Sequence, residues 1–431
     1  MDERLILVTG ATGYIASRLI PRLLDAGHRV RALARRPRQL DGRGWSRQIE
    51  IFPGDVMDPL TLVPALQGVH TAYYLIHNMS SGRGYTAREL EGARNFASAA
   101  SEAGVRHIIY LGGLADPEQH IAPHMRSRIE TGQTLRQGRV PVTEFRAGVI
   151  IGSGSISFEM IRFMTELFPI VPGSAWFHNR SQPIAVQNVV DYLMAALKNS
   201  NGHGRIFEIG GPEIVRYKDL ILRYARARGL RRSMVLLPYI PVRFMAFGVE
   251  LMTPVPYPIA YALIDGLSDD SIVKHDEALR VFPEVTLIGI DEAARKALGY
   301  LSPLHVERVW DDGLRAAKSL KHEGFFILHR ETQIQQSPEK IFADLTRMAD
   351  KTKGQVEASE PLQRLLIRRP HTFGDHWLEW RVSRDNISTY LTQTAFFAPR
   401  GLVGFLYWYL LYPFHVLTFH GFMRKISEQK P

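Results

Sequence analysis

The chain has 431 residues, of which 45% are hydrophobic and 22% are charged, proportions close to those of average soluble globular proteins. They argue against a disordered, collagen-like or multi-span membrane protein, and the length predicts two or three domains. The absence of cysteine excludes disulfide scaffolds, zinc–thiolate sites, iron–sulfur clusters and thiol nucleophiles.

The charge balance is basic, with 53 Lys and Arg residues against 43 Asp and Glu residues, a formal net charge of +10. Because the excess is spread along the chain without a basic arm or stripe, we expect no nucleic-acid partner. No metal site is predicted. The first residues show no signal-peptide pattern, which favours a cytoplasmic location or a membrane surface facing the cytosol.

The first predicted elements are a short apolar strand over residues 5–8 and a glycine turn over residues 9–16, followed by an amphipathic helix. This order is typical of a dinucleotide site, where free amides at a helix N-terminus face the pyrophosphate. Gly10 permits the tight turn, Gly13 lets the backbone approach the ligand, and Ala16 lets the helix pack close to the strand. An ordinary strand–helix turn is the alternative. The residues predicted to contact the cofactor here are Gly10, Thr12, Gly13, Tyr14 and Ile15.

The second predicted strand, residues 28–34, ends in Arg35 and Arg36, where an NAD-specific site usually supplies Asp or Glu to the ribose hydroxyls. Two guanidinium groups suit a 2′-phosphate, because they offer positive charge and forked hydrogen-bond donors. We therefore predict that these two arginines select NADP(H) over NAD(H). A solvated basic turn is the alternative.

Further strands predicted at 49–52, 69–77 and 107–111 alternate with helical stretches such as 90–103. This alternation predicts an α/β fold with a Rossmann-type, doubly wound parallel sheet, and ligands bind at the carboxyl ends of such strands. The residues expected there, near an adenine ring and a nicotinamide ribose, are Asp55, Val56, Leu75, Ile76 and His77.

Seven segments within the first 300 residues form a recognisable set. They are TGATGYIA at 9–16, GDV at 54–56, YYLIH at 73–77, IIYLGGL at 108–114, FRAGVIIGSGS at 145–155, QPIAVQNVVDYLMAAL at 182–197 and FEIGGPE at 207–213. Together they resemble the extended, atypical short-chain dehydrogenase/reductases, and within them the NmrA-like NAD(P)-binding group. The resemblance implies an NADP(H)-binding domain over residues 1–320, with a substrate cap mainly from 155–180 and 215–285. It also implies cofactor contacts from Arg146 and Ala147.

The chain departs from that pattern at the catalytic positions. Catalytic members of the superfamily use Tyr with Lys four residues later, and Ser near the end of the fifth strand. Here the strand ends in Gly112 and Gly113, and the best-matching helix positions hold His124 and Arg128. These two residues form either a replacement catalytic pair or a solvated helix face, and Ser127 offers another hydroxyl. The function is therefore either an oxidoreductase or a non-catalytic NADP(H)-binding redox sensor or assembly factor.

Residues 230–265 are rich in proline, aromatic residues and methionine. Short helices punctuated by proline are predicted here, forming either an apolar pocket wall or ordinary cap core. The first of these readings suits a hydrophobic small-molecule substrate.

The tail, residues 321–431, is predicted as a separate α+β domain. A helix is expected around 309–320, before the tail begins. Within the tail, the pattern predicts a strand over 324–334, a helix opening at Ser337, and strands at 377–382 and 390–396. The strand and helix opening resemble START-like, helix-grip ligand-binding domains. Residues 349–371 are hydrophilic and weakly patterned, which predicts that one or more central strands are missing.

Residues 402–419 have the apolar length of a marginal membrane helix. Pro413, His415 and the many Tyr and Trp residues count against a simple span. A buried tail helix, peripheral membrane contact and a true span all remain open at this point.

Overall fold

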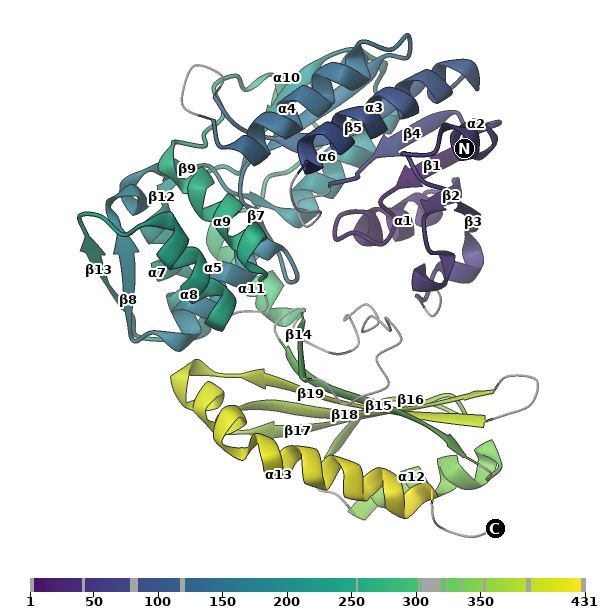
Figure 1. The fold of residues 1–431 in the computed structure, drawn as a ribbon, viewed down its shortest axis with the longest axis vertical. Coiled ribbons are helices and arrows are strands. Elements are labelled where there is room, and N and C mark those ends of the chain that lie inside the picture. Colours follow the sequence, from purple (N-terminus) through teal and green to yellow (C-terminus); the bar gives the residue numbers. More distant parts are fainter. Residues whose placement is uncertain are drawn as a thin grey trace. The chain divides into compact units, whose positions relative to one another are not determined.

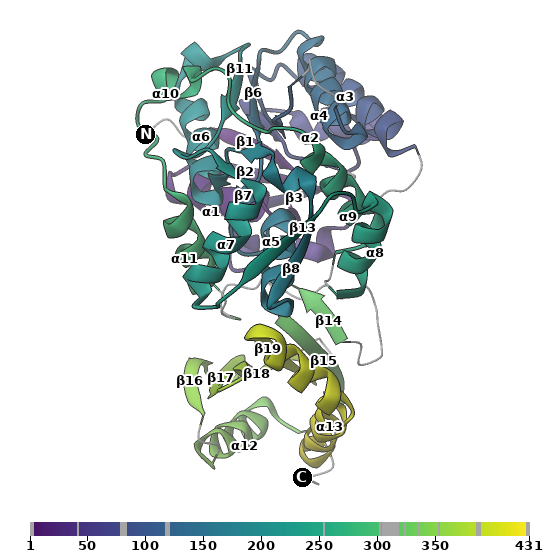
Figure 2. The same ribbon diagram turned by 90° about the vertical axis from the view of Figure 1, so that its left-hand side faces the viewer.

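The computed structural model describes residues 4–40, 43–77, 84–116, 121–252, 255–300, 303, 319–322, 325–334, 336–351, 354–384 and 389–427. The chain forms two compact units (Figures 1 and 2). The first comprises residues 1–162, 172–229 and 233–298, and the second comprises 163–171, 230–232 and 299–431. The predicted domain boundary near residue 320 adjoins residues 304–318, which lie outside the described residues, and it stays a prediction.

A seven-stranded parallel sheet organises the first unit, in the order β11-β6-β5-β4-β1-β2-β3. Its strands are β1 (Leu5–Thr9), β2 (Arg29–Ala34), β3 (Glu50–Pro53), β4 (Thr71–Tyr74), β5 (His107–Gly113), β6 (Val142–Ala147) and β11 (Ile206–Ile209). This sheet confirms the predicted doubly wound α/β fold. The strand order reverses between β1 and β4, so their carboxyl ends form the crevice where such folds bind ligands.

Helices cover both faces of the sheet because alternate strand residues point to opposite sides. Ile6 and Val8 of β1 pack in one apolar cluster with α1 and α6, while Leu7 packs in another with α2 and α3. The helices flanking the sheet are α1 (Ala16–Asp25), α2 (Pro59–Leu66), α3 (Tyr85–Glu102), α4 (Pro123–Arg136) and α6 (Val186–Lys198).

Short elements occupy the predicted cap segments. Two two-stranded pairs, β12 with β9 and β13 with β8, form in or at the edge of these segments, and a third pair, β10 with β7, lies just outside them. Their bounds are β7 (Ile150–Ile151), β8 (Ile170–Ser174), β9 (Arg180–Ser181), β10 (Ile184–Ala185), β12 (Val215–Arg216) and β13 (Ser233–Leu237). The remaining helices up to residue 299 are α5 (Ile156–Leu167), α7 (Tyr217–Arg228), α8 (Val242–Met252), α9 (Tyr257–Asp265), α10 (Glu277–Val281) and α11 (Ile290–Gly299).

The second unit contains a six-stranded antiparallel sheet in the order β14-β15-β19-β18-β17-β16. Its strands are β14 (Ser319–His322), β15 (Phe325–Ile334), β16 (Gln355–Glu360), β17 (Arg364–His371), β18 (Gly374–Arg384) and β19 (Thr389–Pro399). Leu391 of β19 packs in the cluster that includes α12 (Pro338–Lys351), and Phe397 packs in the cluster that includes α13 (Gly401–Ser427). Because these two positions differ by an even number along one strand, both helices lie on the same face of the sheet (Figure 1).

Two expectations for the tail need correction. Residues 349–371 were expected to lack central strands, but they contain β16 and β17, which pair antiparallel. Only a short stretch of β17 is buried, with side chains that pack on both faces of the sheet: Leu365, Leu366 and Ile367. The strand β16 lies at the edge of the sheet and is largely exposed. The polar composition of these residues therefore gave no strand pattern. The helix expected around 309–320 falls mostly outside the described residues, and residues 319–320 begin a strand.

The last helix, α13, has a buried face and an exposed apolar face. Phe405 and Trp408 are buried against the sheet, whereas other large apolar side chains of this helix are 37–73% exposed. None of the described helices is both long and apolar enough to span a bilayer. The exposed side chains are Leu402, Val403, Leu406, Tyr409, Leu410, Leu411, Phe414 and Leu417.

Candidate functional site

The glycine turn follows β1 at the point where the strand order reverses. Gly10 has φ of +63°, and a Cβ placed on it would lie 2.8 Å from the carbonyl oxygen of Leu75 at the end of β4. Only glycine tolerates both the left-handed backbone and this close approach. The Gly13 N–H donates to the Gly10 carbonyl at 2.7 Å, which closes the turn just before α1 begins at Ala16.

Residues distant in sequence hold this turn in place. The Arg43 guanidinium donates to the carbonyls of Thr12 at 3.2 Å and Ala11 at 3.5 Å, although it lies 31 and 32 residues away. Thr9 joins the ends of β1 and β4, since its hydroxyl donates to the Tyr73 carbonyl and accepts from the Leu75 N–H. Arg43 was not predicted as part of the site, because no local sequence pattern indicates which turn a distant arginine contacts.

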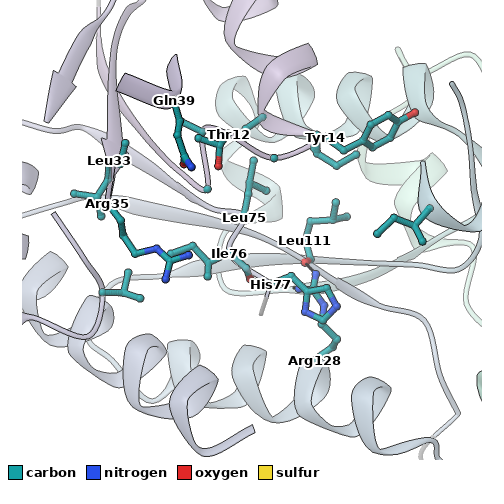
Figure 3. A pocket seen from close by; sticks show the side chains of 18 of the residues that line it. Thr12, Tyr14, Leu33, Arg35, Gln39, Leu75, Ile76, His77, Leu111 and Arg128 are labelled. Atoms are coloured by element: carbon teal, nitrogen blue, oxygen red, sulfur yellow. Dashed lines mark hydrogen bonds between the residues drawn. The ribbon is translucent and has the colours of Figure 1, made fainter. Parts of the chain in front are cut away.

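A cavity of about 760 Å³ opens beside the turn (Figure 3). Most of the predicted cofactor residues line it, contributed by the carboxyl ends of β1 to β4. These are Gly10, Thr12, Gly13, Tyr14, Ile15, Arg35, Asp55, Val56, Leu75, Ile76 and His77. Arg36, Arg146 and Ala147 are not among the described residues that line it, so their cofactor contacts stay predictions.

The two ends of the cavity differ in chemistry. In Figure 3, Arg35 lies on the left beyond Ile76, and His77 lies with Arg128 on the right. Arg35 is exposed and directly follows β2, where the chain has no carboxylate. Asp55 follows β3, and its carboxylate accepts the Met57 N–H at 3.0 Å. A phosphate bound at the Arg35 end would therefore meet a cation, with no carboxylate on the same strand end to compete.

Arg146 is engaged elsewhere in the structure. Its guanidinium donates to Glu144 at 2.7 Å, and the fully buried Glu144 also pairs with Arg136. Burial lowers the pKa of Arg146, although the side chain stays cationic in this pairing. The structure thus places this arginine in a buried ion-pair group, and Arg146 is not among the described residues that line the cavity.

A buried polar cluster adjoins the right-hand end of the cavity. The His77 Nδ1 and the Glu89 Oε1 are 3.0 Å apart, and the Ser127 hydroxyl donates to the other oxygen of Glu89. Glu89 is only 4% exposed and Ser127 is fully buried. The cluster joins the end of β4 to the helices α3 and α4.

His124 and Arg128 belong to the same region. The interpretation of this pair as a solvated helix face is wrong for His124, because this side chain is only 6% exposed. Burial lowers the pKa of His124 to about 4. Arg128 lines the cavity, donates to the carbonyl of Leu111, and stacks over the ring of Tyr110 at 5.3 Å. His124 is not among the described lining residues, so the two residues differ in their access to a ligand.

Glu89 was also not predicted as part of the site. In the helix over 85–102 it looks like one of several surface charges, but it falls on the buried face with Gly92, Ala93 and Phe96. A carboxylate at i, with small or apolar residues at i+3, i+4 and i+7, is the signal that could have identified it.

A second cavity, of about 540 Å³, lies within the second unit between its sheet and α13. Aromatic and imidazole side chains dominate its wall, and no acidic side chain is among the described lining residues. The residues that line it are Leu328, Arg369, Pro370, His371, His376, Trp377, Leu378, Gln393, Ala395, Phe396, Tyr407, Trp408 and His415.

Comparison with known families matches two parts of the chain. Residues 2–161 match the NmrA-like family, and residues 348–422 match a family described only as protein of unknown function DUF2867. The second match leaves the predicted START-like character of the tail without support from a characterised family.

Characterised relatives match the larger part of the chain. It is 31% identical over 272 residues to (4-alkanoyl-5-oxo-2,5-dihydrofuran-3-yl)methyl phosphate reductase of Streptomyces griseus, covering 60% of this chain and 85% of that protein. It is 24% identical over 242 residues to the photosystem II assembly factor Ycf39 of Cyanophora paradoxa, covering 54% of this chain and 71% of the factor.

Solved structures share the fold. The triphenylmethane reductase of Citrobacter sp., in complex with NADP(H), aligns with a TM-score of 0.55 at 20% identity, covering 68% of this chain and 99% of that one. The Escherichia coli quinone oxidoreductase QOR2, in complex with NADPH, aligns with a TM-score of 0.55 at 18% identity, covering 67% and 98%.

Proposed function

Because the chain belongs to the NmrA-like family of NAD(P)-binding, atypical short-chain dehydrogenase/reductase-like proteins, we propose that it is an NADP(H)-dependent oxidoreductase acting on a hydrophobic small molecule. The predicted resemblance to this family is confirmed. The observation that carries the proposal is the cavity at the reversal point of the sheet, with the glycine turn along it and Arg35 at one end.

The described residues fit such a cofactor. The turn brings the start of α1 to the place for a pyrophosphate, where the backbone N–H groups of a helix N-terminus face an anion, and Gly13 has no Cβ to obstruct a close approach. Arg35 would hold the 2′-phosphate. When bound, the nicotinamide supplies hydride chemistry, and the protein supplies binding, orientation and proton transfer.

A binding titration tests the cofactor preference. We expect NADPH to bind more tightly than NADH, and Arg35→Ala to weaken NADPH binding by roughly 10- to 100-fold, the loss of one charge-assisted contact. Arg38→Ala is the matched control, because Arg38 is also exposed but does not line the cavity. Equal affinity of the two dinucleotides would contradict the assignment of Arg35.

The apolar wall of the cavity supports a hydrophobic substrate. Leu111, Ile150, Ile156 and Leu263 line it, and Leu263 comes from α9 within the proline-rich segment that suggested a pocket wall. The phosphate-bearing furanone named for the Streptomyces relative belongs to that protein, and the substrate of this chain is unidentified.

A non-catalytic sensor or assembly factor is the second candidate. It is favoured by Gly112 and Gly113, which leave the end of β5 without a hydroxyl, and by the similarity to an assembly factor. Consumption of NADPH with a panel of aldehydes, quinones and enones separates the two. Turnover supports the oxidoreductase, whereas tight NADPH binding without turnover across the panel supports the sensor.

For the tail, we propose a START-like, helix-grip domain that binds a small apolar ligand. The strand order and the packing of α12 and α13 on one face support this proposal, as does the cavity between the sheet and α13. Ala395→Trp would place an indole in that cavity, so we expect weaker binding of the fluorescent probe 1-anilinonaphthalene-8-sulfonate to the full chain. Unchanged binding would argue against the ligand site.

We also propose that the exposed apolar face of α13 makes peripheral membrane contact. Residues 401–423 contain no Asp, Glu, Lys or Arg, and basic residues flank them at 400, 424 and 425. Phe414, which is 66% exposed, is the natural probe. Sedimentation with phosphatidylglycerol vesicles should be lost in Phe414→Asp, and a full chain that never sediments with vesicles would refute the proposal.

A further inference from the structure

We propose that His77 and Glu89 form the proton-transfer pair of this site, with His77 as the catalytic residue and Glu89 as the residue that positions it. The inference rests on the proposed oxidoreductase function. It assigns proton transfer to residues that differ from His124 and Arg128, the positions that match the Tyr and Lys of the larger superfamily.

Access to the ligand separates the candidates. His77 follows β4 at the reversal point of the sheet and lines the cavity, with its side chain 27% exposed. His124 is buried and is not among the described lining residues. Arg128 lines the cavity, but its guanidinium donates to the Leu111 carbonyl, and an arginine does not release its proton in a protein. Of these three side chains, His77 alone combines access with an exchangeable proton.

The hydrogen bonds around Glu89 favour one tautomer of the His77 imidazole. The Ser127 hydroxyl donates to one carboxylate oxygen, and the other lies 3.0 Å from the His77 Nδ1. When Glu89 is ionised, its carboxylate only accepts hydrogen bonds, so Nδ1 of His77 carries a proton and donates it. The other nitrogen, Nε2, is then left with its lone pair. A carboxylate that orients a histidine in this manner also stabilises the imidazolium once it forms.

The charges facing His77 come from two helices. Burial and the cationic Arg128 of α4 lower the pKa of His77, while Glu89 of α3 raises it, and His124 of α4 lies close enough to interact electrostatically. Near neutral pH the imidazole is therefore largely uncharged and able to take up a proton. Glu89 keeps protonation accessible despite the burial.

For a carbonyl substrate, the proposed step couples a hydride transfer to a proton transfer from His77. The imidazolium of His77 would give its Nε2 proton to the carbonyl oxygen, while the carbonyl carbon would receive the hydride, with its electron pair, that a bound reduced dinucleotide supplies. The products would be an alcohol and the oxidised dinucleotide. His77 is left neutral and takes its next proton from water. In the reverse direction, neutral His77 accepts the proton of the alcohol at Nε2.

Two variants and a matched control test the pair in the full chain. With NADPH and the most reactive quinone or aldehyde of the panel, we expect His77→Gln to lower kcat by roughly 100-fold or more, as expected for loss of a general acid–base group. Glu89→Gln keeps the shape of the side chain but removes its charge and so lowers the pKa of His77. We therefore expect kcat to fall, and the alkaline limb of the pH profile, where His77 loses the proton that it donates, to move to lower pH. Glu91→Gln makes the same chemical change two residues along α3 at an exposed position and should leave both unchanged.

A second measurement does not depend on turnover. In the ¹⁵N-histidine spectrum, His77 of the wild-type chain should show the Nδ1–H form, and Glu89→Gln should lower its pKa relative to wild type and to Glu91→Gln. Titration with NADPH checks that each variant folds and binds the cofactor.

The outcomes separate the two claims. A wild-type chain that binds NADPH but turns over no compound in the panel refutes the oxidoreductase, and the catalytic assignment with it. A wild-type chain that is active, with His77→Gln equally active or with the Glu89→Gln pH profile unchanged, refutes the proton-transfer pair alone. An Nε2–H form of His77 in the wild-type spectrum contradicts the pair irrespective of activity.

Discussion

Replacing Gly10 by alanine should damage both the stability of the first unit and its affinity for NADPH. The substitution combines two costs. A non-glycine residue at φ of +63° loses about 1–2 kcal/mol, and the new Cβ would lie 2.8 Å from the Leu75 carbonyl oxygen, which forces the ends of β1 and β4 apart at a further cost of about 1–3 kcal/mol. We expect the free energy of unfolding to fall by about 2–5 kcal/mol in total.

Gly27→Ala separates these two costs. Gly27 has φ of +80°, but a Cβ there would meet nothing within 4 Å, and the residue does not line the cavity. It should therefore lose only the backbone contribution of about 1–2 kcal/mol and retain NADPH affinity. Urea unfolding followed by circular dichroism, with NADPH fluorescence titration, measures both quantities. If Gly10→Ala and Gly27→Ala lose equal stability and both bind NADPH like wild type, the close approach of β1 and β4 does not shape the site.

Three further predictions concern buried polar groups. Arg43→Ala should weaken NADPH binding several-fold in the same titration, because the turn loses two carbonyl contacts at Ala11 and Thr12, and an unchanged affinity would count against this supporting role. Glu144→Gln should lower the free energy of unfolding by about 3 kcal/mol, because Arg136 and Arg146 keep their charges but lose the buried carboxylate. Urea denaturation measures this change, and a loss under 1 kcal/mol would contradict the prediction. Burial lowers the pKa of His107 to about 3, so this residue is protonated at a lower pH in the folded chain than in the unfolded chain. The free energy of unfolding should therefore fall by about 1.4 kcal/mol per pH unit as the pH drops from about 6.5 towards 3. His107→Gln should flatten that slope in unfolding measurements across this range, and an identical slope in the variant would show that other groups cause it.

Much of the fold could be predicted because its signals are local. The apolar runs of β1 and β5 are continuous because parallel strands are buried on both faces, and the turn after β1 depends on glycines that stand close together in sequence. The strands β16 and β17 were missed for the opposite reason. They form one edge of an antiparallel sheet, where polar residues face water and only a three-residue stretch in β17 is buried.

The candidate site divides in the same way. The amino-acid sequence alone predicts the glycine turn, the basic residue after β2 and the missing Tyr and Lys, because each is a property of neighbouring residues. The folded chain was needed to show that Arg43 supports the turn, that Arg146 pairs with Glu144, and that His77 lies beside Glu89. These partners lie on different strands and helices, and a buried charge acquires its role from whatever the fold brings within hydrogen-bond distance.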